Sequence, residues 1–324
     1  MSAEQRVGVR IGARTLSLSN LDKVLWPKDG YTKGDLIEYY RAVARYAVAH
    51  LKGRPLTLQR YPNGIEGPTF FEKQMPKGMP EWIGRVTVPT PGGTRSELTF
   101  PLCNDEPGLV YFANLAAIVL HVWTSRVPTL DEPEFVLFDL DPGEKCALRT
   151  LAKVALTVRD LLAEIGLRAL VKTTGGFGVH VVVPLGSGYS YETAKVFAEL
   201  IARRAAAALG DLATLLRAVA KRPSSAVYVD YVQVGLGKTI VAPYSVRARD
   251  RAPVSTPLHW SEVEAFARTR SATAPWDEFA KYTIRTTPGR LAREGDLWGP
   301  KFWKVQRLEG ASAKARRLWN SVKG

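Results

Sequence analysis

The chain has 324 residues, of which 46% are hydrophobic, and this is enough for a substantial core in a folded protein. The longest apolar runs are too short to cross a bilayer and the N-terminal residues show no apolar signal segment, so neither a membrane protein nor a secreted one is expected. The net charge of +14 favours a polyanionic partner such as nucleic acid, with a solubilising surface charge as the alternative.

Helical and strand patterns alternate along the chain, which indicates an α/β or α+β fold. A capping-box pattern over residues 32–35 opens an amphipathic helix that runs to about Leu51. Further helices are predicted over residues 148–165 and 190–210. Strands rich in β-branched and aromatic residues are predicted over residues 55–60, 85–90, 134–140, 168–173, 179–185, 226–234 and 239–244. A turn is predicted at 91–97 and irregular chain at 249–257.

The last segment, residues 299–324, is basic and contains the aromatic residues Phe302, Trp303 and Trp319. We expect this tail to be helical. The composition favours two interpretations equally: a basic amphipathic helix that binds nucleic acid, or a helix that docks on the protein through its aromatic side chains.

The most informative local pattern is the apolar run FVLFDLDPG at 135–143, which ends in two aspartates separated by one residue. Side chains alternate along a strand, so Asp139 and Asp141 are expected on one face. Two neighbouring carboxylates repel each other unless a cation lies between them, and hard oxygen ligands suit Mg²⁺ or Mn²⁺. A polar turn after a strand is the alternative, because Asp-Pro-Gly also favours a turn.

A third aspartate, Asp230, lies among apolar neighbours in the β-forming run 226–234, where an unpaired carboxylate is costly. A metal shared with Asp139 and Asp141 would relieve that cost. Three carboxylates from two strands would then form a two-metal site, which activates an attacking 3′-hydroxyl and stabilises the leaving pyrophosphate. A buried aspartate paired with an arginine or lysine is the alternative.

A glycine-rich segment lies between these two aspartate-bearing runs. Its three glycines are expected to leave backbone N–H groups free to approach a phosphate, although most such loops are plain turns. These glycines are Gly175, Gly176 and Gly178. Thr174 and His180 could add hydrogen bonds to phosphate oxygens.

Three basic residues follow Asp230 in the sequence: Lys238, Arg247 and Arg249. The two arginines are two residues apart in a stretch expected to be extended, so both could face one triphosphate. Ordinary surface arginines are the alternative.

The order of these motifs resembles the polymerase domain of bacterial DNA ligase D, a branch of the archaeo-eukaryotic primase superfamily. The chain reads DLDP, then TTGGFGVH, then VDYVQ, and then GKTIVAPYSVRAR. The N-terminal half agrees over residues 20–40, 55–76 and 121–126. The resemblance implies a primase-like catalytic core with a central, mainly antiparallel β-sheet flanked by helices. It also implies a single catalytic module over residues 1–298, followed by the basic tail.

The resemblance implies a template-dependent nucleotidyltransferase that adds nucleotides, with ribonucleotides preferred, to 3′ ends at gaps or double-strand breaks during DNA repair. Two Mn²⁺ or Mg²⁺ ions would be its cofactors, and NTPs or dNTPs its substrates. Its partner would be gapped, nicked or broken DNA with a 5′-phosphate. Ku and a DNA ligase would be further partners of a monomer in the bacterial cytoplasm, associated with the nucleoid.

The resemblance also implies roles for particular residues. The metal ligands would be Asp139, Asp141 and Asp230. The incoming nucleotide would be held by Thr174, Gly175, Gly176, Gly178, His180, Lys238, Arg247 and Arg249. The 5′-phosphate of the DNA would be bound near a helix start by Asn20, Lys23 and Lys33. The template side of the DNA would be contacted by Arg60, Phe70, Phe71 and Lys73.

The chain departs from the family pattern at a few positions. Thr174 stands where the family usually has Ser, and Phe177 where it often has Lys. Val234 and Leu236 stand where most members have Asn and Arg. These departures suggest an alternative, a catalytically weakened member that binds 5′-phosphorylated DNA ends. A nuclease or phosphodiesterase explains the carboxylates and the charge, but it gives the glycine-rich loop and the paired arginines no role.

Overall fold

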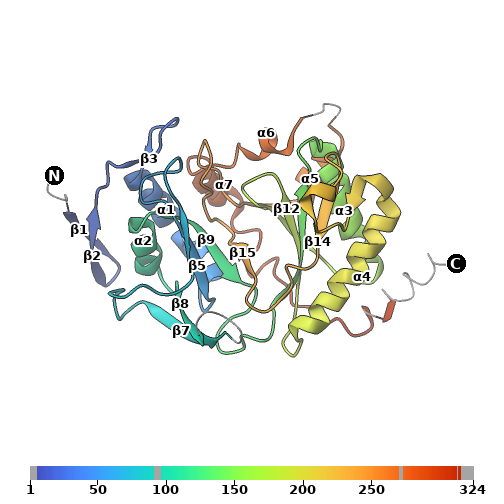
Figure 1. Ribbon diagram of the computed structural model, residues 1–324, viewed down its shortest axis with the longest axis horizontal. Helices are drawn as coiled ribbons and strands as arrows, with labels where there is room; N and C mark the ends of the chain where they lie inside the picture. Colours follow the sequence, from blue (N-terminus) through green and yellow to red (C-terminus); the bar gives the residue numbers. More distant parts are fainter. Residues whose placement is uncertain (1–5, 91–95, 270–272, 312, 315–324) are drawn as a thin grey trace. The chain divides into compact units, whose positions relative to one another are not determined.

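The computed structural model describes residues 6–90, 96–269, 273–311 and 313–314, and it folds into two compact units (Figure 1). Each unit is assembled from three separate stretches of chain. Unit 1 comprises Met1–Pro128, Thr239–Ser255 and Tyr282–Gly295. Unit 2 comprises Thr129–Lys238, Thr256–Lys281 and Asp296–Gly324. The single module predicted over residues 1–298 stays a prediction.

Unit 1 is built on a four-stranded antiparallel sheet with the strand order β15-β9-β5-β6. The strands of this sheet are β5 (Leu56–Arg60), β6 (Phe70–Glu72), β9 (Ala117–Trp123) and β15 (Thr239–Val241). Three two-stranded hairpins accompany it: β1 (Arg6–Ile11) with β2 (Arg14–Ser19), β3 (Val24–Trp26) with β4 (Tyr31–Thr32), and β7 (Gly84–Pro89) with β8 (Glu97–Leu102). The helices are α1 (Lys33–Leu51), α2 (Glu106–Asn114) and α7 (Thr287–Glu294).

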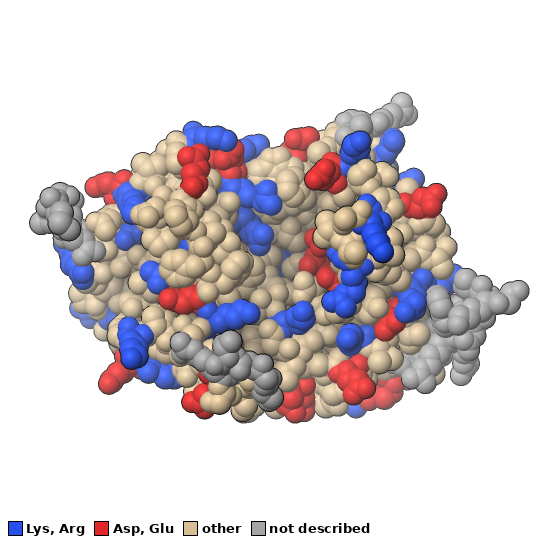
Figure 2. All heavy atoms as spheres, viewed as in Figure 1, with Lys and Arg blue, Asp and Glu red and all other residues tan. Residues whose placement is uncertain are grey.

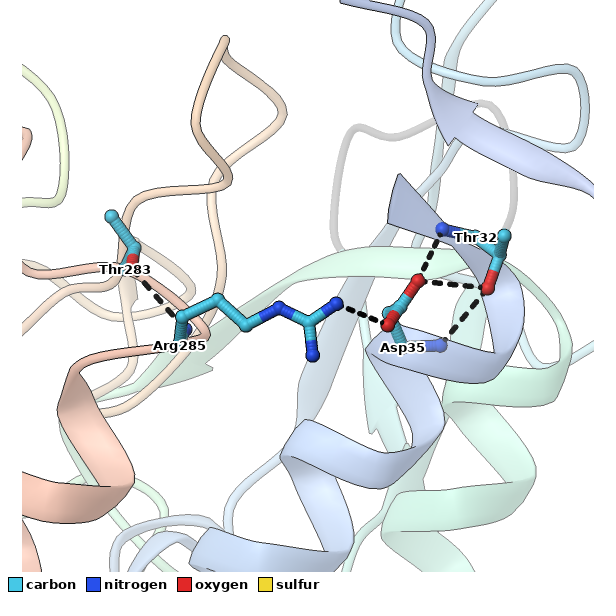
Figure 3. A network of polar contacts seen from close by, with 4 residues as sticks. All are labelled: Thr32, Asp35, Thr283 and Arg285. Atoms are coloured by element: carbon cyan, nitrogen blue, oxygen red, sulfur yellow. Dashed lines mark hydrogen bonds and ion pairs between the residues drawn. The ribbon is translucent and has the colours of Figure 1, made fainter. Parts of the chain in front are cut away.

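Helix α1 begins where its sequence predicts. The Thr32 hydroxyl accepts a hydrogen bond from the Asp35 N–H, and the Asp35 carboxylate accepts one from the Thr32 N–H, so the predicted capping box is confirmed. Arg285, just before α7, donates to the same carboxylate at 2.6 Å (Figure 3). The Asp35 carboxylate thus accepts a hydrogen bond from the backbone at the start of α1. It also binds Arg285, which lies 250 residues further along the chain.

Unit 2 is built on a six-stranded sheet with the order β13-β14-β10-β12-β11-β16. Its strands are β10 (Phe135–Pro142), β11 (Leu170–Thr173), β12 (Val179–Pro184), β13 (Ala213–Thr214), β14 (Val227–Asp230) and β16 (Pro257–Leu258). Its helices are α3 (Leu148–Glu164), α4 (Tyr191–Leu209), α5 (Trp260–Ala267) and α6 (Pro275–Phe279), with short 3₁₀ turns at Gly210–Leu212 and Val219–Lys221.

All neighbouring strands in this sheet are antiparallel except β13 and β14, so the prediction of a mixed fold with a mainly antiparallel central sheet is confirmed. Helices α3 and α4 pack on the sheet, as predicted for flanking helices (Figure 1). The middle strands β10 and β12 are buried almost throughout, because their runs of Val, Leu and Phe lie in the core. Each such side chain stabilises the fold by about 1.5–3 kcal/mol.

Residues 299–310 of the tail form turns and extended chain, so the prediction of a helix is wrong for them, whereas residues 311, 313 and 314 are helical and the rest of the predicted helix stays a prediction. The Trp303 ring lies 5.6 Å from the ring of Phe135 and 5.9 Å from that of Trp298. The Gln306 side chain donates to and accepts from the backbone of Arg168, both at 2.7 Å. These contacts hold the chain extended against unit 2. Trp319 lies outside the described residues, as does most of the turn predicted at 91–97.

Most predicted elements are confirmed to within a few residues, but several elements were not predicted at all. These are the hairpin strands β1 to β4, the strands β6, β8, β9, β13 and β16, and the helices α2, α5, α6 and α7. Within the described ranges, no helix is long and apolar enough to cross a membrane.

Candidate active site and nucleic-acid interface

Strand register brings the predicted acidic residues together on one face of the sheet in unit 2. Asp139 of β10 is paired directly with His180 of β12 on one side and with Asp230 of β14 on the other. Directly paired residues point to the same face, and Asp141 shares that face because it lies two positions along the strand. The His180 Nε2 atom lies 3.3 Å from the Asp139 Oδ1 atom. The four side chains therefore form a single cluster, the aspartate row.

The carboxylates of the aspartate row shift one another's pKa values. Burial, together with the carboxylates of Asp139 and Asp230, raises the pKa of Asp141 to about 7, although Asp141 still reaches solvent. Burial and Asp139 also raise the pKa of Asp230, while a hydrogen bond from the Val232 N–H at 2.8 Å acts in the opposite direction. Neighbouring carboxylates therefore disfavour the ionised forms of Asp141 and Asp230.

This donor set fits a hard divalent cation such as Mg²⁺ or Mn²⁺, because it offers carboxylate oxygens in mutual repulsion. The side chains as they stand do not enclose an ion. Across the described ranges, no three His, Cys, Asp or Glu side chains are close enough to hold one. An ion shared by Asp139, Asp141 and Asp230 would have to draw them together against their repulsion.

The glycine-rich loop between β11 and β12 packs directly on the strand that carries Asp139 and Asp141. A Cβ atom on Gly178 would lie 2.5 Å from the Leu140 carbonyl oxygen and 3.5 Å from the Asp141 Oδ1 atom. Only glycine allows so close an approach. The Thr174 N–H donates to the Gly178 carbonyl at 3.0 Å, which closes the loop next to the carboxylate.

The expectation that this loop presents free N–H groups is wrong for two of its glycines. The Gly175 N–H donates to the Thr173 hydroxyl at 3.3 Å, and the Gly176 N–H donates to the Thr174 hydroxyl at 3.2 Å. The reason is local, because a threonine hydroxyl readily accepts from an N–H two residues further on. A phosphate could bind these N–H groups only by replacing two long hydrogen bonds.

The positions at which the chain departs from the family pattern have different environments in unit 2. Phe177 is 43% exposed, and its ring centroid lies 5.7 Å from that of Trp276 in α6. Val234 is buried in the core, whereas Leu236 is 59% exposed. Phe177 therefore places an aromatic surface, rather than a cation, beside the glycine-rich loop.

The three predicted triphosphate-binding cations are not all in the unit that holds the aspartate row. Lys238 is exposed in unit 2, whereas Arg247 and Arg249 belong to unit 1. The expectation that the arginines lie in an extended stretch is wrong. The Arg249 N–H donates to the Arg247 carbonyl at 2.9 Å, and the Arg247 N–H donates to the Pro253 carbonyl at 2.7 Å. The backbone therefore forms a tight turn, and binding of one triphosphate by both side chains stays a prediction.

The residues predicted to bind a 5′-phosphate are joined through their backbones in unit 1. The Lys23 N–H donates to the Asn20 carbonyl at 3.1 Å, and the Lys33 N–H donates to the Lys23 carbonyl at 2.8 Å. Asn20 has a φ of 52°, which turns the chain sharply at this point. This geometry places the three residues next to the N-terminal end of α1, where the helix dipole favours an anion.

Both lysine side chains at this end of α1 already have acceptors in the protein. The Lys23 Nζ atom donates to Asn63 Oδ1 at 2.9 Å. Lys33 is buried, and its Nζ atom donates to the Asn114 carbonyl at 3.1 Å and to the Ser19 hydroxyl at 3.3 Å. Sequence reasoning missed these acceptors because Asn114 lies 81 residues from Lys33 in the chain.

The residues predicted on the template side lie on β5, on the edge strand β6 and just after it. Phe70 and Phe71 are 44% and 59% exposed, and successive residues of a strand point to opposite faces. Arg60 is paired in register with Phe70, and its guanidinium lies 5.2 Å from that ring. The same guanidinium forms an ion pair with Glu72 at 3.2 Å and donates to a backbone carbonyl at 2.9 Å. Lys73 is exposed.

Sequence reasoning also missed Arg222, a cation whose charge acts on two residues of the aspartate row. Its charge lowers the pKa of both Asp141 and Asp230. The guanidinium lies 3.6 Å from the ring of Tyr228 and donates to the Leu216 carbonyl at 2.9 Å. No local motif marks this arginine, because only the fold brings its loop beside β14.

The basic charge is not confined to the predicted sites. Figure 2 shows Lys and Arg side chains over the surfaces of both units, interspersed with Asp and Glu. The net charge of +14 therefore gives a broadly positive surface, which attracts a polyanion without fixing where it binds.

Comparisons with known proteins agree with the motifs. Residues 32–298 match the sequence family described as the LigD primase-polymerase domain. Over 98% of its length the chain is 36% identical to the multifunctional non-homologous end joining DNA repair protein LigD of Mycobacterium tuberculosis, of which it covers 39%. Over 86% of its length it is 30% identical to the bifunctional LigD of Bacillus subtilis, of which it covers 43%. The chain thus spans about two fifths of these curated relatives.

The fold is also similar to a solved structure, the polymerase domain from Mycobacterium tuberculosis ligase D in complex with DNA. The TM-score is 0.78 at 36% sequence identity, and the match covers 87% of this chain and 96% of that one. Family match, sequence identity and fold therefore agree: the chain belongs to the LigD primase-polymerase domain family.

Proposed function

We propose that this protein is a template-dependent nucleotidyltransferase that adds nucleotides to 3′ ends at gaps and double-strand breaks during DNA repair. The observation that carries this proposal is the aspartate row, in which Asp139 and Asp230 are paired across two strands and Asp141 shares their face. Family membership makes a primase-polymerase role the best account of that geometry. A preference for ribonucleotides is part of the proposal.

Asp139, Asp141 and Asp230 would hold two divalent cations, either Mn²⁺ or Mg²⁺. When bound, such ions activate the attacking 3′-hydroxyl and stabilise the charge on the leaving pyrophosphate. The contribution of the protein is to fix the carboxylates in register before any substrate arrives. His180 is held beside Asp139, so its ring is positioned at the same face to donate to a phosphate oxygen.

The incoming NTP or dNTP would be held by the glycine-rich loop together with Lys238, Arg247 and Arg249. Thr174 supports this role, because its hydroxyl lies in the loop that Gly178 brings against Asp141. Phosphate oxygens would take over the hydrogen bonds that Gly175 and Gly176 now give to threonine hydroxyls.

The DNA would be recognised mainly by unit 1. Asn20, Lys23 and Lys33 would bind the 5′-phosphate at a gap, nick or broken end. Phe70 and Phe71 would stack on template bases, with Arg60 and Lys73 along the backbone. We place the protein in the bacterial cytoplasm at the nucleoid, as a monomer acting with Ku and a DNA ligase; the names of its relatives support the part of this proposal that concerns non-homologous end joining.

Primer extension on gapped DNA tests this proposal. The gap should carry or lack a 5′-phosphate, and each NTP and dNTP should be supplied with Mn²⁺ or Mg²⁺. We expect templated products, more with NTPs and more with the phosphate. Asp139→Ala should give no product while its affinity for the gapped DNA is unchanged. Extension by Asp139→Ala at the wild-type rate would overturn the assignment.

One observation favours a second candidate, a module that binds DNA ends without catalysis. Phe177 stands where the family often has Lys and packs beside Trp276, so one phosphate contact is missing from the loop. The same assay separates the two candidates. Tight binding that depends on the 5′-phosphate, without product at any metal concentration, would favour the binding module.

A further inference from the structure

Unit 1 contains a cavity of about 420 Å³ that none of the predicted roles uses. Its walls come from β1, from β2, from the loop before β7 and from the C-terminal end of α2. The lining residues that matter here are Ser17, Ser19, Trp82, Tyr111, Asn114 and Leu115. A volume of this size suits one small ligand.

The wall of the cavity at the end of α2 also holds two cations predicted to contact DNA. The Asn114 carbonyl accepts a hydrogen bond from Lys33 Nζ at 3.1 Å, and the Leu115 carbonyl accepts one from Arg60 Nε at 2.9 Å. The Ser19 hydroxyl, on the opposite strand β2, accepts from the same lysine at 3.3 Å. The cavity therefore lies directly behind the predicted 5′-phosphate ligand and the predicted template-side arginine.

The chemistry of the lining suits a flat aromatic ligand with polar edges. The rings of Trp82 and Tyr111 meet edge to face at 5.7 Å, and Arg14 lies 4.7 Å from the Trp82 ring. Three donors of the lining make no hydrogen bond to any residue in the described ranges: the Trp82 indole N–H, the Tyr111 hydroxyl and the Ser17 hydroxyl. A nucleobase combines the required π-face with edge acceptors, and stacking on an aromatic side chain tolerates any base.

We propose that this cavity receives the base of the 5′-terminal nucleotide of the DNA, unpaired from the template, while Lys23 and Lys33 hold its phosphate. This inference rests on the proposed function, because it takes the 5′-phosphate site as the anchor. Unpairing a terminal nucleotide costs little free energy, and unpairing a mismatched one costs less still. The cavity would thus recognise frayed or mismatched ends, at which a break cannot be sealed directly.

Binding of gapped DNA without metal or nucleotide tests the cavity. Three 5′-phosphorylated downstream strands are compared, with a paired, a mismatched or an abasic terminal nucleotide. We expect the mismatched end to bind wild-type protein about five- to tenfold more tightly than the abasic end. Trp82→Leu and Tyr111→Leu should abolish that difference while the gain from the 5′-phosphate is kept. In Ser17→Phe, an exposed position on the lining, the added ring should fill the cavity and give the same loss.

Trp260→Leu is the matched control, since Trp260 is a half-buried indole in unit 2 that does not line this cavity, and it should keep the full base-dependent difference. The inference is overturned if wild-type protein binds mismatched and abasic ends equally, or if Ser17→Phe keeps the difference. If the control loses the difference as well, the effect is not local to the cavity and the inference also fails. Failure of primer extension would overturn the proposed function instead, because this binding assay involves no catalysis.

Discussion

The charged residues of the two proposed sites have different surroundings in the two units. In unit 2, Asp139 and Asp230 raise the pKa of Asp141, and Asp139 raises that of Asp230. In unit 1, Lys23 and Lys33 each donate to an oxygen of the protein. A bound cation would relieve the repulsion on Asp141 and Asp230, whereas a phosphate must compete with the oxygens that already accept hydrogen bonds from the two ammonium groups.

This difference shows how each site is built. The aspartate row follows from the pairing of neighbouring strands, so it is fixed by the core that surrounds it. The lysines are held by individual hydrogen bonds to Asn63, Ser19 and Asn114. Those bonds orient the ammonium groups before DNA arrives, and they reduce the affinity that the same groups could give to a phosphate.

The largest expected effect is that of Asp141→Asn, which separates function from stability in unit 2. Primer extension should fall by about a thousandfold or more, because a metal ligand is lost. The melting temperature in the presence of a chelator at neutral pH should rise, because burial and two carboxylates disfavour the ionised form of Asp141. Asp131→Asn, at an exposed position of the same unit, should change neither quantity. A lower melting temperature for Asp141→Asn would contradict the repulsion.

Gly178→Ala tests whether the glycine-rich loop must touch the acidic strand. The new Cβ atom would lie 2.5 Å from the Leu140 carbonyl oxygen, so the loop must move away from Asp141. We expect a loss of about 1–3 kcal/mol in the free energy of unfolding, together with a clear fall in extension rate. Gly186→Ala is the matched control, because the nearest atom to its Cβ would lie at 3.8 Å. Equal stability of the two variants in denaturant titrations would argue against the close packing.

Lys33→Met and Lys23→Met distinguish the buried lysine from the exposed lysine in unit 1. Lys33 is buried with two acceptors, so its loss should cost about 1–3 kcal/mol in denaturant titrations. Lys23 is exposed, and its replacement should change the free energy of unfolding by less than about 0.5 kcal/mol. Both variants should lose the gain in affinity that a 5′-phosphate gives to gapped DNA. Retention of that gain in both would remove these lysines from the phosphate site.

A pH-dependent effect on stability is expected for Asp35, whose carboxylate joins α1 to Arg285. Burial alone would raise the pKa of Asp35, but the hydrogen bonds with Thr32 and the charge of Arg285 outweigh it and hold the pKa below its ordinary value of 3.8. Asp35→Asn should therefore lower the free energy of unfolding by about 1 kcal/mol at neutral pH. Because the folded-state pKa is depressed, this difference should be complete above pH 3.8 and shrink as the pH falls further. Unfolding curves at pH 7 and pH 3 check this, and a constant difference would contradict it.

Sequence patterns predicted the parts of the fold that local physics determines. The capping box at Thr32 and Asp35, the stop at Gly210 and the shared face of Asp139 and Asp141 all follow from a few adjacent residues. Helix α2 and strand β9 were not predicted, because residues 106–123 form a nearly continuous apolar stretch in which helical and strand patterns are hard to separate.

The features of the site that could not be predicted from the sequence depend on contacts between segments that are distant in the chain. No pattern near Lys33 indicates that its ammonium binds Asn114, and no motif places Arg222 beside the aspartate row. The turn at Arg247 and Arg249 was mistaken for extended chain because no local pattern indicates that the Arg249 N–H donates to the Arg247 carbonyl or that the Arg247 N–H donates to the Pro253 carbonyl. The shared face of Asp139 and Asp141 in unit 2 was therefore predictable from sequence, whereas the hydrogen-bond partners of the cations in unit 1 were not.

The interleaving of the two units has a consequence for dissecting this protein by deletion. Each unit uses three stretches of chain, so the polypeptide passes between them five times, after residues 128, 238, 255, 281 and 295. A fragment ending at Pro128 would lack β15, which pairs with β9 at one edge of the sheet, and would also lack α7. Such a fragment would expose an unpaired strand edge, which favours aggregation. Separating DNA binding from catalysis therefore calls for point substitutions rather than truncation.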